Sequence, residues 1–358
     1  MGYETFLLFV VGIVALVAGA ELLVRGASRI AIAVGISPLV VGLTVVAMGT
    51  SSPELAVSVG AVMKDGGSAG IALGNVVGSN IFNVLFILGL SAVVTPLVVH
   101  AALIRRDVPV MIGASVLVWF FARDGALTRV EGAILFALVV PYIAFLIVES
   151  RREAREKGSS DAPVAKPSPM GVVRDVAFIV VGLVFLVLGA DWLVSAAVTV
   201  AKDFGVSDVV IGLTIVAGGT SLPEVAASVM ASLKGERDIA VGNVVGSNIL
   251  NIMLVLGPTV VIAGHVEVDA GLAAFDVPVM IAVAVACLPI FFIGSRVSRG
   301  EGALFLGYYV AYTTVLVFRA TSHPQLGSLS NALLYFALPL TVLTLAIFVV
   351  REWRARRS

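Results

Sequence analysis

Charged residues are scarce in this 358-residue sequence. Asp, Glu, Lys and Arg together make up 13% of the chain, whereas apolar residues make up 59%. Soluble globular domains carry about 25% charged residues, so roughly half of the usual surface charge is missing. The deficit excludes a soluble globule, because the remaining polar residues are too few to cover its surface. We therefore interpret the chain as an integral membrane protein.

The chain also has few cysteines and histidines, and its net charge is zero. The single cysteine, Cys287, excludes an intramolecular disulfide framework and a cysteine-based metal cluster. The three histidines, His100, His265 and His323, fall in predicted loops and offer no proton relay. The 23 basic residues balance the 23 acidic ones, which argues against a nucleic-acid partner. No hydrolytic motif is present and no cofactor is indicated. The expected partners are the lipid bilayer and transported ions, with no protein partner evident.

Long apolar runs recur throughout the chain. A bilayer core about 30 Å thick is crossed by a helix of roughly 20 apolar residues. Runs near that length predict eleven membrane-spanning segments. They cover residues 5–24, 38–63, 69–98, 107–122, 129–149, 172–194, 207–233, 238–264, 276–295, 301–318 and 332–350. The first run is not a signal peptide, because no basic residue precedes it and Arg25 and Arg29 follow it.

The positions of the basic residues predict the orientation in the membrane. With the N-terminus outside, five of the 23 basic residues lie in external segments and the other eighteen in cytoplasmic ones. The five external residues are Lys64, Arg123, Arg129, Lys202 and Arg319. Positive charges accumulate on the cytoplasmic side of membrane proteins, which favours this orientation over the reverse one. It places the basic C-terminal tail in the cytoplasm.

Two sequence motifs occur twice in the chain. Gly49-Thr-Ser-Ser-Pro-Glu54 returns as Gly219-Thr-Ser-Leu-Pro-Glu224. Gly74-Asn-Val-Val-Gly-Ser-Asn-Ile-Phe-Asn83 returns as Gly242-Asn-Val-Val-Gly-Ser-Asn-Ile-Leu-Asn251. The first ten predicted spans are therefore two copies of one five-helix unit. Because five is an odd number, the second copy crosses the membrane in the opposite sense, as in many secondary transporters.

The repeat predicts the fold class and the domain boundaries. We expect an all-α membrane protein, a ten-helix inverted repeat (5+5) with broken helices that carry the motifs, plus one extra C-terminal transmembrane helix. The units are 1–150, the first repeat; 151–171, a cytoplasmic linker; 172–320, the second, inverted repeat; and 321–358, the extra helix and basic tail. A weaker echo of Asp107-Val-Pro-Val-Met111 in Asp276-Val-Pro-Val-Met280 extends the match beyond the two motifs.

The first motif places one acidic residue deep in each copy, Glu54 and Glu224. A charged side chain at the bilayer centre costs at least about 2.5–3.5 kcal/mol by insertion scales. Two such residues at equivalent positions indicate a polar cavity that binds a cation. Pro53 and Pro223 lack an amide hydrogen and displace the carbonyl four residues earlier. We therefore expect both helices to open there and to expose backbone carbonyls to the cavity.

Helical spacing predicts which polar side chains accompany the carboxylates. Residues four apart lie on one face of a helix, which pairs Thr50 with Glu54 and Ser79 with Asn83, and their counterparts in the second copy. All of these donors are hard oxygens, which Ca²⁺ and Na⁺ prefer more than Zn²⁺ or Cu²⁺ do. Gly-x-x-x-Gly faces that allow close helix packing lie at Gly74, Gly78, Gly242 and Gly246.

Two further pairs of asparagines in the second motif have structural interpretations. Asn75 and Asn243 fall near the predicted starts of their helices, where capping is at least as good an interpretation as cation binding. Asn80 and Asn248 directly follow the motif serines and so point to another face. We expect them to form hydrogen bonds between helices.

The doubled motifs resemble the two alpha repeats of the calcium/cation antiporter superfamily. Within it, the sequence is most similar to prokaryotic sodium/calcium exchangers. The resemblance covers roughly residues 1–320. It implies ten helices in two inverted halves around four central cation sites, in a prokaryotic plasma (inner) membrane.

The resemblance also implies a ligand set. The implied ligands of Ca²⁺ are the carboxylates of Glu54 and Glu224, which also serve Na⁺, and the backbone oxygens of Thr50 and Thr220. The implied outlying Na⁺ sites contain Ala47, Ser51, Ser79, Ala217, Ser221 and Ser247. The implied central polar pair is Asn83 and Asn251.

Together, the residues and the resemblance predict a secondary active antiporter that exchanges Ca²⁺ for Na⁺ by alternating access and extrudes Ca²⁺ as Na⁺ enters. Three alternatives remain open. A proton/Ca²⁺ antiporter would replace Na⁺ by protonation of the glutamates. A cation channel would need a continuous pore, which an inverted repeat with two broken helices does not favour. An intramembrane enzyme would need a water-activating geometry that these motifs do not suggest.

Overall fold

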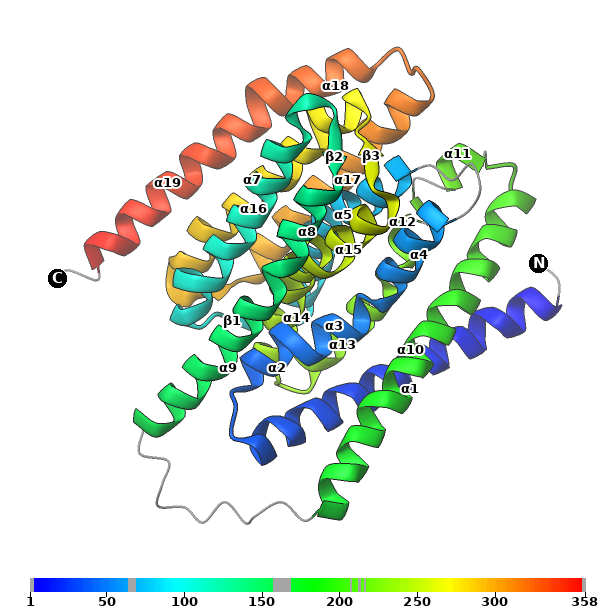
Figure 1. Ribbon diagram of the computed structural model, residues 1–358. Coiled ribbons are helices and arrows are strands. Elements are labelled where there is room, and N and C mark those ends of the chain that lie inside the picture. The colour runs from blue at the N-terminus through cyan, green and yellow to red at the C-terminus, as the bar shows by residue number, and fades with distance from the viewer. Residues whose placement is uncertain are drawn as a thin grey trace.

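The computed structural model describes residues 3–63, 69–156, 169–206, 208–211, 214–215 and 217–355, and it is nearly all helical (Figure 1). Its α-helices in chain order are α1 (Tyr3–Val34), α2 (Pro38–Val41), α3 (Ala47–Thr50), α4 (Ser52–Met63), α5 (Ala69–Phe82), α6 (Gly89–Val94), α7 (Val108–Phe121), α8 (Arg129–Ala137), α9 (Val139–Glu156), α10 (Pro169–Asp203), α11 (Asp208–Ile211), α12 (Ala217–Gly219), α13 (Leu222–Leu233), α14 (Arg237–Leu250), α15 (Gly257–Ala263), α16 (Val277–Phe292), α17 (Arg299–Ala320), α18 (Leu326–Ala332) and α19 (Leu338–Ala355). Short π-helical segments adjoin several of them, at Gly42–Val46, Asn83–Leu88, Leu103–Asp107, Asn251–Leu256, Leu272–Asp276 and Leu333–Ala337.

Eight helical stretches of the described residues are long and apolar enough to cross a membrane. They are Tyr3–Val34, Gly70–Val94, Arg129–Arg152, Met170–Asp203, Arg237–Ala263, Leu272–Ser295, Arg299–Ala320 and Leu326–Arg354. The bent pair Pro38–Thr50 and Ser52–Met63 makes a ninth if it counts as one span. The spans predicted at 107–122 and 207–233 are not among these, and part of the second lies outside the described residues. The prediction of a helical membrane protein is confirmed, whereas the count of eleven spans stays a prediction.

Helices α1 and α10 lie side by side along one flank of the molecule (Figure 1). Glycines permit their close approach. A Cβ added at Gly19 would lie 2.7 Å from the carbonyl oxygen of Gly182, and one added at Gly189 would lie 2.8 Å from that of Gly12. Contacts this short leave room only for hydrogen, so the two backbones pack directly on each other. The pair joins the first helix of one repeat copy to the first helix of the other.

The helix that carries each first motif is interrupted beside the motif serine. Helix α3 ends at Thr50, Ser51 has φ −80° and ψ 7°, and α4 leaves at an angle of 42°. Pro53 occupies the first turn of α4, where its missing N–H removes no helical hydrogen bond. The break therefore lies just before the proline, close to where it was expected. One freed carbonyl is not left open, because the Ser52 hydroxyl donates to the Gly49 oxygen at 2.7 Å.

Four short strands correct the expectation of an exclusively helical chain. β1 (Leu97–Val98) pairs with β4 (Arg296–Val297), and β2 (Ala126–Thr128) pairs with β3 (His265–Glu267), both antiparallel. The span predicted to reach residue 98 therefore ends at Val94 as a helix. Each ladder joins a segment of residues 1–150 to a segment of residues 172–320, so the two sequence copies are tied together at two places by backbone hydrogen bonds.

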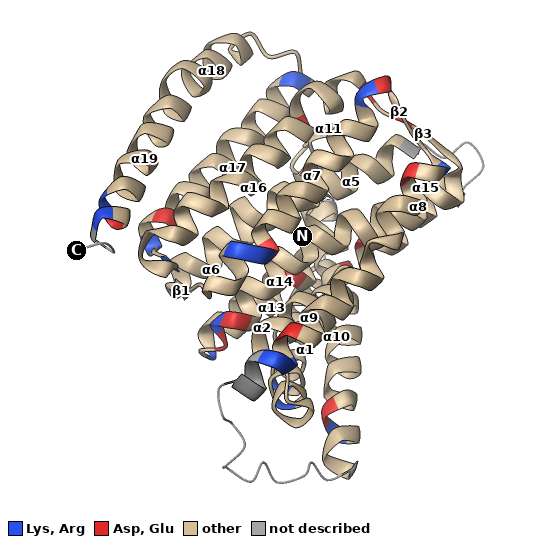
Figure 2. Ribbon diagram, turned by 60° about the vertical axis from the view of Figure 1, so that its left-hand side comes forward, with Lys and Arg blue, Asp and Glu red and all other residues tan. Residues whose placement is uncertain are grey.

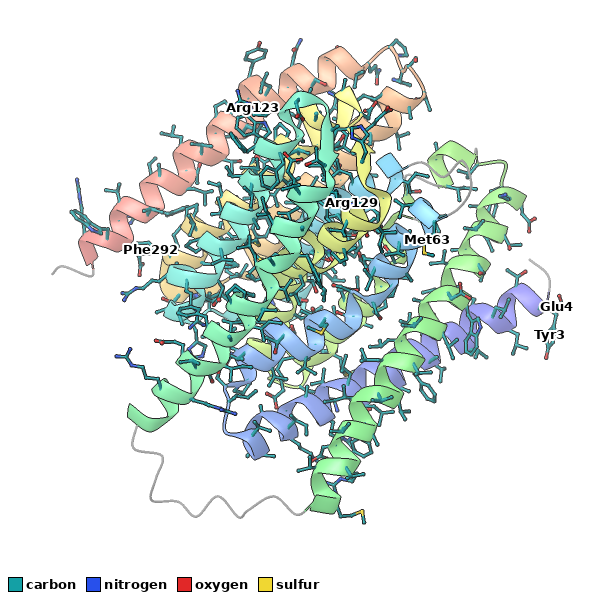
Figure 3. All side chains as sticks on the ribbon, in the orientation of Figure 1. Tyr3, Glu4, Met63, Arg123, Arg129 and Phe292 are labelled. Atoms are coloured by element: carbon teal, nitrogen blue, oxygen red, sulfur yellow. The ribbon has the colours of Figure 1, made fainter. Side chains whose placement is uncertain are left out.

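Most charged residues lie at helix ends and in turns, which leaves an uncharged band between them (Figure 2). Tyr3 and Glu4 project from the N-terminal end of α1, and Arg123 and Arg129 flank β2 at the turn between α7 and α8 (Figure 3). A few acidic residues are buried instead, and two of them are Glu54 and Glu224. Most of the linker predicted for 151–171 lies outside the described residues.

Candidate cation site

Glu54 and Glu224 occupy equivalent places in the fold. Each is the third residue of its helix, α4 or α13, and their exposed fractions are 0% and 1%. The first turn of a helix carries unpaired amide groups and a partial positive charge, which favours a carboxylate there. The break before each helix thus produces the local structure that holds the carboxylate inside the protein.

Each carboxylate is bound by a serine from the other copy of the motif. The Ser221 hydroxyl donates to Glu54 Oε1 at 2.7 Å, and the Ser51 hydroxyl donates to Glu224 Oε1 at 3.0 Å. Ser221 also contacts the Ser79 hydroxyl at 3.2 Å. The two motifs therefore meet in one buried cluster, as the sequence predicted, and each completes the binding of the other's carboxylate.

Thr50 contributes differently from the prediction. Helical spacing placed its hydroxyl on one face with Glu54, but the break at Ser51 lies between the two residues. The hydroxyl instead lies 3.2 Å from Asn243 Oδ1 and 3.4 Å from the Ala47 carbonyl oxygen. Ala47 is fully buried, and its carbonyl also accepts the Ser51 amide at 3.0 Å. Thr50 therefore lies in the cluster through its contact with the other motif copy, and its shared face with Glu54 stays a prediction.

Several oxygen atoms of the predicted ligand set have no hydrogen bond in the described part of the chain. Among the described residues, eight buried side-chain polar atoms lack a partner. Six of them belong to the predicted ligand set: Glu54 Oε2, Glu224 Oε2, Asn83 Oδ1, Asn251 Oδ1, Thr220 Oγ1 and Ser247 Oγ. A buried polar atom left unpaired costs about 1–3 kcal/mol, and more if it is charged. A cation bound between these oxygens would offset that cost for all of them.

Asn75 and Asn243 do not cap their helices. Each lies six residues inside its helix, and its amide nitrogen donates to the glutamate-bearing helix of the same repeat copy. Asn75 Nδ2 donates to the Glu54 carbonyl oxygen at 3.2 Å and to the Ser58 hydroxyl at 3.0 Å. Asn243 Nδ2 donates to the Ser228 hydroxyl at 2.9 Å. The capping interpretation is wrong: these asparagines fasten α4 to α5 and α13 to α14.

The remaining predicted residues are placed as follows. Ser79, Asn83, Ser247 and Asn251 are fully or almost fully buried on α5, α14 and the π-helical segments that follow them. Ala217 is the first residue of α12, and its side chain lies outside the described part of the structure. Asn80 and Asn248 bond across the two helices, which confirms their predicted structural role.

Sequence reasoning missed a second pair of acids inside the fold, of which Asp107 is fully buried and Asp276 is partly buried. The Tyr142 hydroxyl lies 3.5 Å from Asp107 Oδ1, and the Tyr312 hydroxyl donates to Asp276 at 2.7 Å. In the sequence, the two aspartates belong only to the weak match between the Asp-Val-Pro-Val-Met segments of the two copies. The two tyrosines stand 170 positions apart, the offset of the first motif, so a longer comparison of the copies would have found the pairing.

The donor set differs from that of a transition-metal centre. No group of three His, Cys, Asp or Glu side chains gathers anywhere in the described ranges. The cluster instead combines two carboxylates with amide and hydroxyl oxygens, a set suited to hard cations such as Ca²⁺ and Na⁺. Residues 4–148 and 175–318 match the family model described as "Sodium/calcium exchanger protein". This chain belongs to the sodium/calcium exchanger family.

Curated relatives match the exchanger over nearly their whole length. It is 39% identical over 310 residues to the putative antiporter CaxA of Alkalimonas amylolytica, covering 86% of this chain and 96% of that protein. It is 34% identical over 349 residues to the sodium/calcium exchanger MaX1 of Methanosarcina acetivorans, covering 87% and 98%. A solved structure of the sodium-calcium exchanger NCX_Mj matches with a TM-score of 0.75 at 30% identity, covering 88% of this chain and 99% of that chain.

These matches confirm the resemblance seen in the motifs. The exchanger is a cation antiporter for Ca²⁺ in the membrane, and its family consists of transporters rather than enzymes.

Proposed function

We propose that the exchanger moves Ca²⁺ in one direction and Na⁺ in the other through the buried cluster between α4, α5, α13 and α14. The pair of carboxylates carries this proposal. One comes from each motif copy, and each has one oxygen bound by a serine of the other copy. The second oxygen of each has no hydrogen-bond partner in the described part of the chain and can bind a cation.

The charge of the cluster supports exchange of these two ions. Two carboxylates among neutral amides and hydroxyls are balanced by one Ca²⁺. Three Na⁺ in the same cluster, as the resemblance implies, would add one more positive charge. Exchange would then be electrogenic, and the membrane potential would contribute about 2.3 kcal/mol per 100 mV for each charge moved. Na⁺ entry could therefore drive Ca²⁺ extrusion.

The proposed ligand assignments follow the motifs. Ca²⁺ binds the two glutamates and the backbone oxygens of Thr50 and Thr220. The outlying Na⁺ sites contain Ala47, Ser51, Ser79, Ala217, Ser221 and Ser247, and Asn83 and Asn251 form the central pair. The unpartnered oxygens among the described residues of this set support these assignments, because a cation would satisfy them.

The proposed architecture is two inverted five-helix halves, 1–150 and 172–320, joined by the 151–171 linker, with the extra helix and tail in 321–358. The repeated motifs and the contacts between them support it. Two nearly equivalent halves can exchange conformations about a central site, which is the basis of alternating access. We place the protein in the plasma (inner) membrane of a prokaryote, with the N-terminus outside and the C-terminus in the cytoplasm.

Proton coupling is the competing proposal, since a proton can neutralise a buried carboxylate as a cation does. Purified protein in liposomes separates the two. Vesicles loaded with Na⁺ should take up ⁴⁵Ca²⁺ when diluted into Na⁺-free buffer at equal pH on both sides. Vesicles that are acidic inside and free of Na⁺ should not take it up. Uptake driven only by the pH difference would replace Na⁺ with H⁺ in the proposal.

A further inference from the structure

Four asparagines form a hydrogen-bonded cluster where α5 meets α14. Asn80 Nδ2 donates to the main-chain oxygen of Asn248 at 3.1 Å, and Asn248 Nδ2 donates to the main-chain oxygen of Asn80 at 3.3 Å. A main-chain carbonyl can only accept a hydrogen bond, so the NH₂ group of each side-chain amide must face it. The two helix backbones therefore fix which way these amides point.

Two buried methionines accept the same NH₂ groups. Asn80 Nδ2 lies 3.7 Å from Met280 Sδ, and Asn248 Nδ2 lies 3.4 Å from Met111 Sδ. A thioether is a weak acceptor and cannot donate. Each amide thus has acceptors for both of its hydrogens, and its Oδ1 is directed away from them. Met111 and Met280 close the Asp-Val-Pro-Val-Met echo that the carboxylate cluster does not use.

The orientation of the Asn80 and Asn248 amides fixes the orientation of the Asn251 and Asn83 amides. Asn80 Oδ1 accepts Asn251 Nδ2 at 3.1 Å, and Asn248 Oδ1 accepts Asn83 Nδ2 at 3.0 Å. With their nitrogens occupied, Asn83 and Asn251 turn their own Oδ1 atoms the other way. Those two oxygens are buried and have no hydrogen-bond partner in the ranges that the structure describes. A flipped amide would instead set two acceptors against each other and present NH₂ where its oxygen now lies.

We propose that Asn80 and Asn248 are positioning residues that make Asn251 and Asn83 present oxygen, rather than NH₂, to the transported cations. Met280 and Met111 support them by accepting the remaining hydrogens. The inference rests on the proposed function, because it assumes that cations bind beside Asn83 and Asn251. Groups that orient a cation's ligands from behind typically change its affinity by about 10–100-fold when they are removed.

Asn80→Leu tests the inference, because it keeps the side-chain size and removes the acceptor for Asn251. The purified full-length protein in detergent is dialysed against ⁴⁵Ca²⁺, with Na⁺ as the displacing ion. We expect the half-saturating concentration of at least one of the two cations to rise about tenfold. Asn251→Asp supplies the decisive background. A carboxylate presents oxygen however it rotates, so Asn80→Leu should lower neither affinity there.

Asn83→Asp is the matched control background. Asn83 lies one turn from Asn80 on the same chain segment, but Asn248 orients it. Asn80→Leu should therefore keep its tenfold effect beside Asn83→Asp and lose it beside Asn251→Asp. Asn248→Leu should show the opposite pattern. Equal losses in every background, or no loss in wild type, would overturn the inference, because a merely structural role predicts no such selectivity.

A milder variant covers the case in which Asn80→Leu does not fold. Met280→Leu keeps the apolar volume and removes only the weak acceptor behind Asn80, so we expect a loss of about threefold that disappears in the Asn251→Asp background. If Met280→Leu and Asn251→Asp instead changed the affinity independently of each other, the inference would be contradicted. Wild type that binds no Ca²⁺ at all would refute the proposed function, and this inference with it. Wild type that binds Ca²⁺ without the selective pattern refutes this inference alone.

Discussion

At the scale of single residues, the two oxygens of each carboxylate have different roles. One oxygen of Glu54 and one of Glu224 accept a serine hydroxyl from the opposite motif copy. The other oxygens have no such bond within the described residues. The first oxygen fixes the orientation of the carboxylate, and the second is available to a cation. An antiporter needs both properties, because the site must hold its shape while different ions occupy it.

Glu54→Gln and Glu224→Gln should each abolish Ca²⁺ exchange in a folded protein. Glutamine has nearly the same shape but leaves Ca²⁺ with one negative charge too few. Removing one member of a buried charge pair costs about 2–5 kcal/mol, so we expect Ca²⁺ affinity to fall at least about 30-fold. The measurement is Na⁺-driven ⁴⁵Ca²⁺ uptake in liposomes. Glu4→Gln, at the exposed start of α1, is the control and should transport normally. Normal uptake by either site variant would show that the site lies elsewhere.

Ser221→Ala and Ser51→Ala should weaken Ca²⁺ binding less severely. Each removes the hydroxyl that holds the other copy's glutamate. A hydrogen bond to a charged group contributes about 1.5–3 kcal/mol, and part of it is recovered when the carboxylate reorients. We therefore expect a loss of about tenfold in affinity, measured by dialysis against ⁴⁵Ca²⁺. Ser52→Ala is the matched control, because that exposed hydroxyl donates to the Gly49 carbonyl oxygen of its own motif and not to a carboxylate. Equal effects of all three variants would contradict the assignment.

Sequence alone predicted the composition of this cluster but not its connections. The duplication of the motifs identified the glutamates, because two acids at equivalent depths in a membrane are costly unless a cation pairs with them. Helical spacing then paired Thr50 with Glu54, but it could not indicate that the Thr50 hydroxyl contacts Asn243 of the other copy. Spacing describes neighbours on one helix. The bond from Ser221 to Glu54 joins residues 167 positions apart, which no local pattern specifies.

At the scale of elements, the glycines of the second motif are used unequally in the two copies. A Cβ added at Gly246 would lie 2.6 Å from the Leu43 Cα, so the π-helical segment Gly42–Val46 packs against the backbone of α14. A Cβ added at Gly78 would have no atom of the described chain within 4 Å. The expectation that both Gly-x-x-x-Gly faces pack tightly is therefore confirmed for the second copy, and at Gly78 it stays a prediction, because the counterpart of Leu43 lies outside the described residues.

Gly246→Ala should destabilise the exchanger, whereas Gly78→Ala should not. At Gly246 the extra methyl group meets backbone that cannot rotate away, and such overpacking costs about 1–3 kcal/mol. At Gly78 alanine gains about 0.5–1 kcal/mol of helix propensity and meets no atom of the described residues within 4 Å. Heating each variant in detergent and measuring the monodisperse fraction by size exclusion tests this. Equal melting temperatures for the two variants would show that the contact with Leu43 is not tight.

The short strands show where pattern-based prediction of elements stops. Alternation of apolar and polar residues identifies a strand only over four or more residues. β1 and β4 have two residues each, so the end of the apolar run at 98 was indistinguishable from the end of a helix. The helices themselves were predicted well, because a run of about 20 apolar residues has no other solution in a bilayer than a helix.

At the scale of the whole molecule, several connections within the described residues join the two sequence copies. The α1–α10 pair, the β1–β4 and β2–β3 ladders and the carboxylate cluster each join residues 1–150 to residues 172–320. Two ladders hold the copies together away from the buried site. The alternating access that we propose would therefore have to keep these connections or change them together, which favours movement of groups of helices over separation of the two copies.

The orientation in the membrane can be tested with single cysteines in a Cys287→Ala background. Lys202→Cys, at the end of α10, should react with an impermeant thiol reagent added to intact cells. Arg299→Cys, at the start of α17, should react only after the membrane is opened. Both side chains are exposed, so access depends on the side of the membrane and not on burial. We expect this because eighteen basic residues fall on the side that holds Arg299 and five on the other side. Positive charges accumulate on the cytoplasmic side, so the side with Arg299 should be cytoplasmic. Labelling of Arg299→Cys but not Lys202→Cys in intact cells would overturn the proposed orientation, while leaving the buried cluster unchanged.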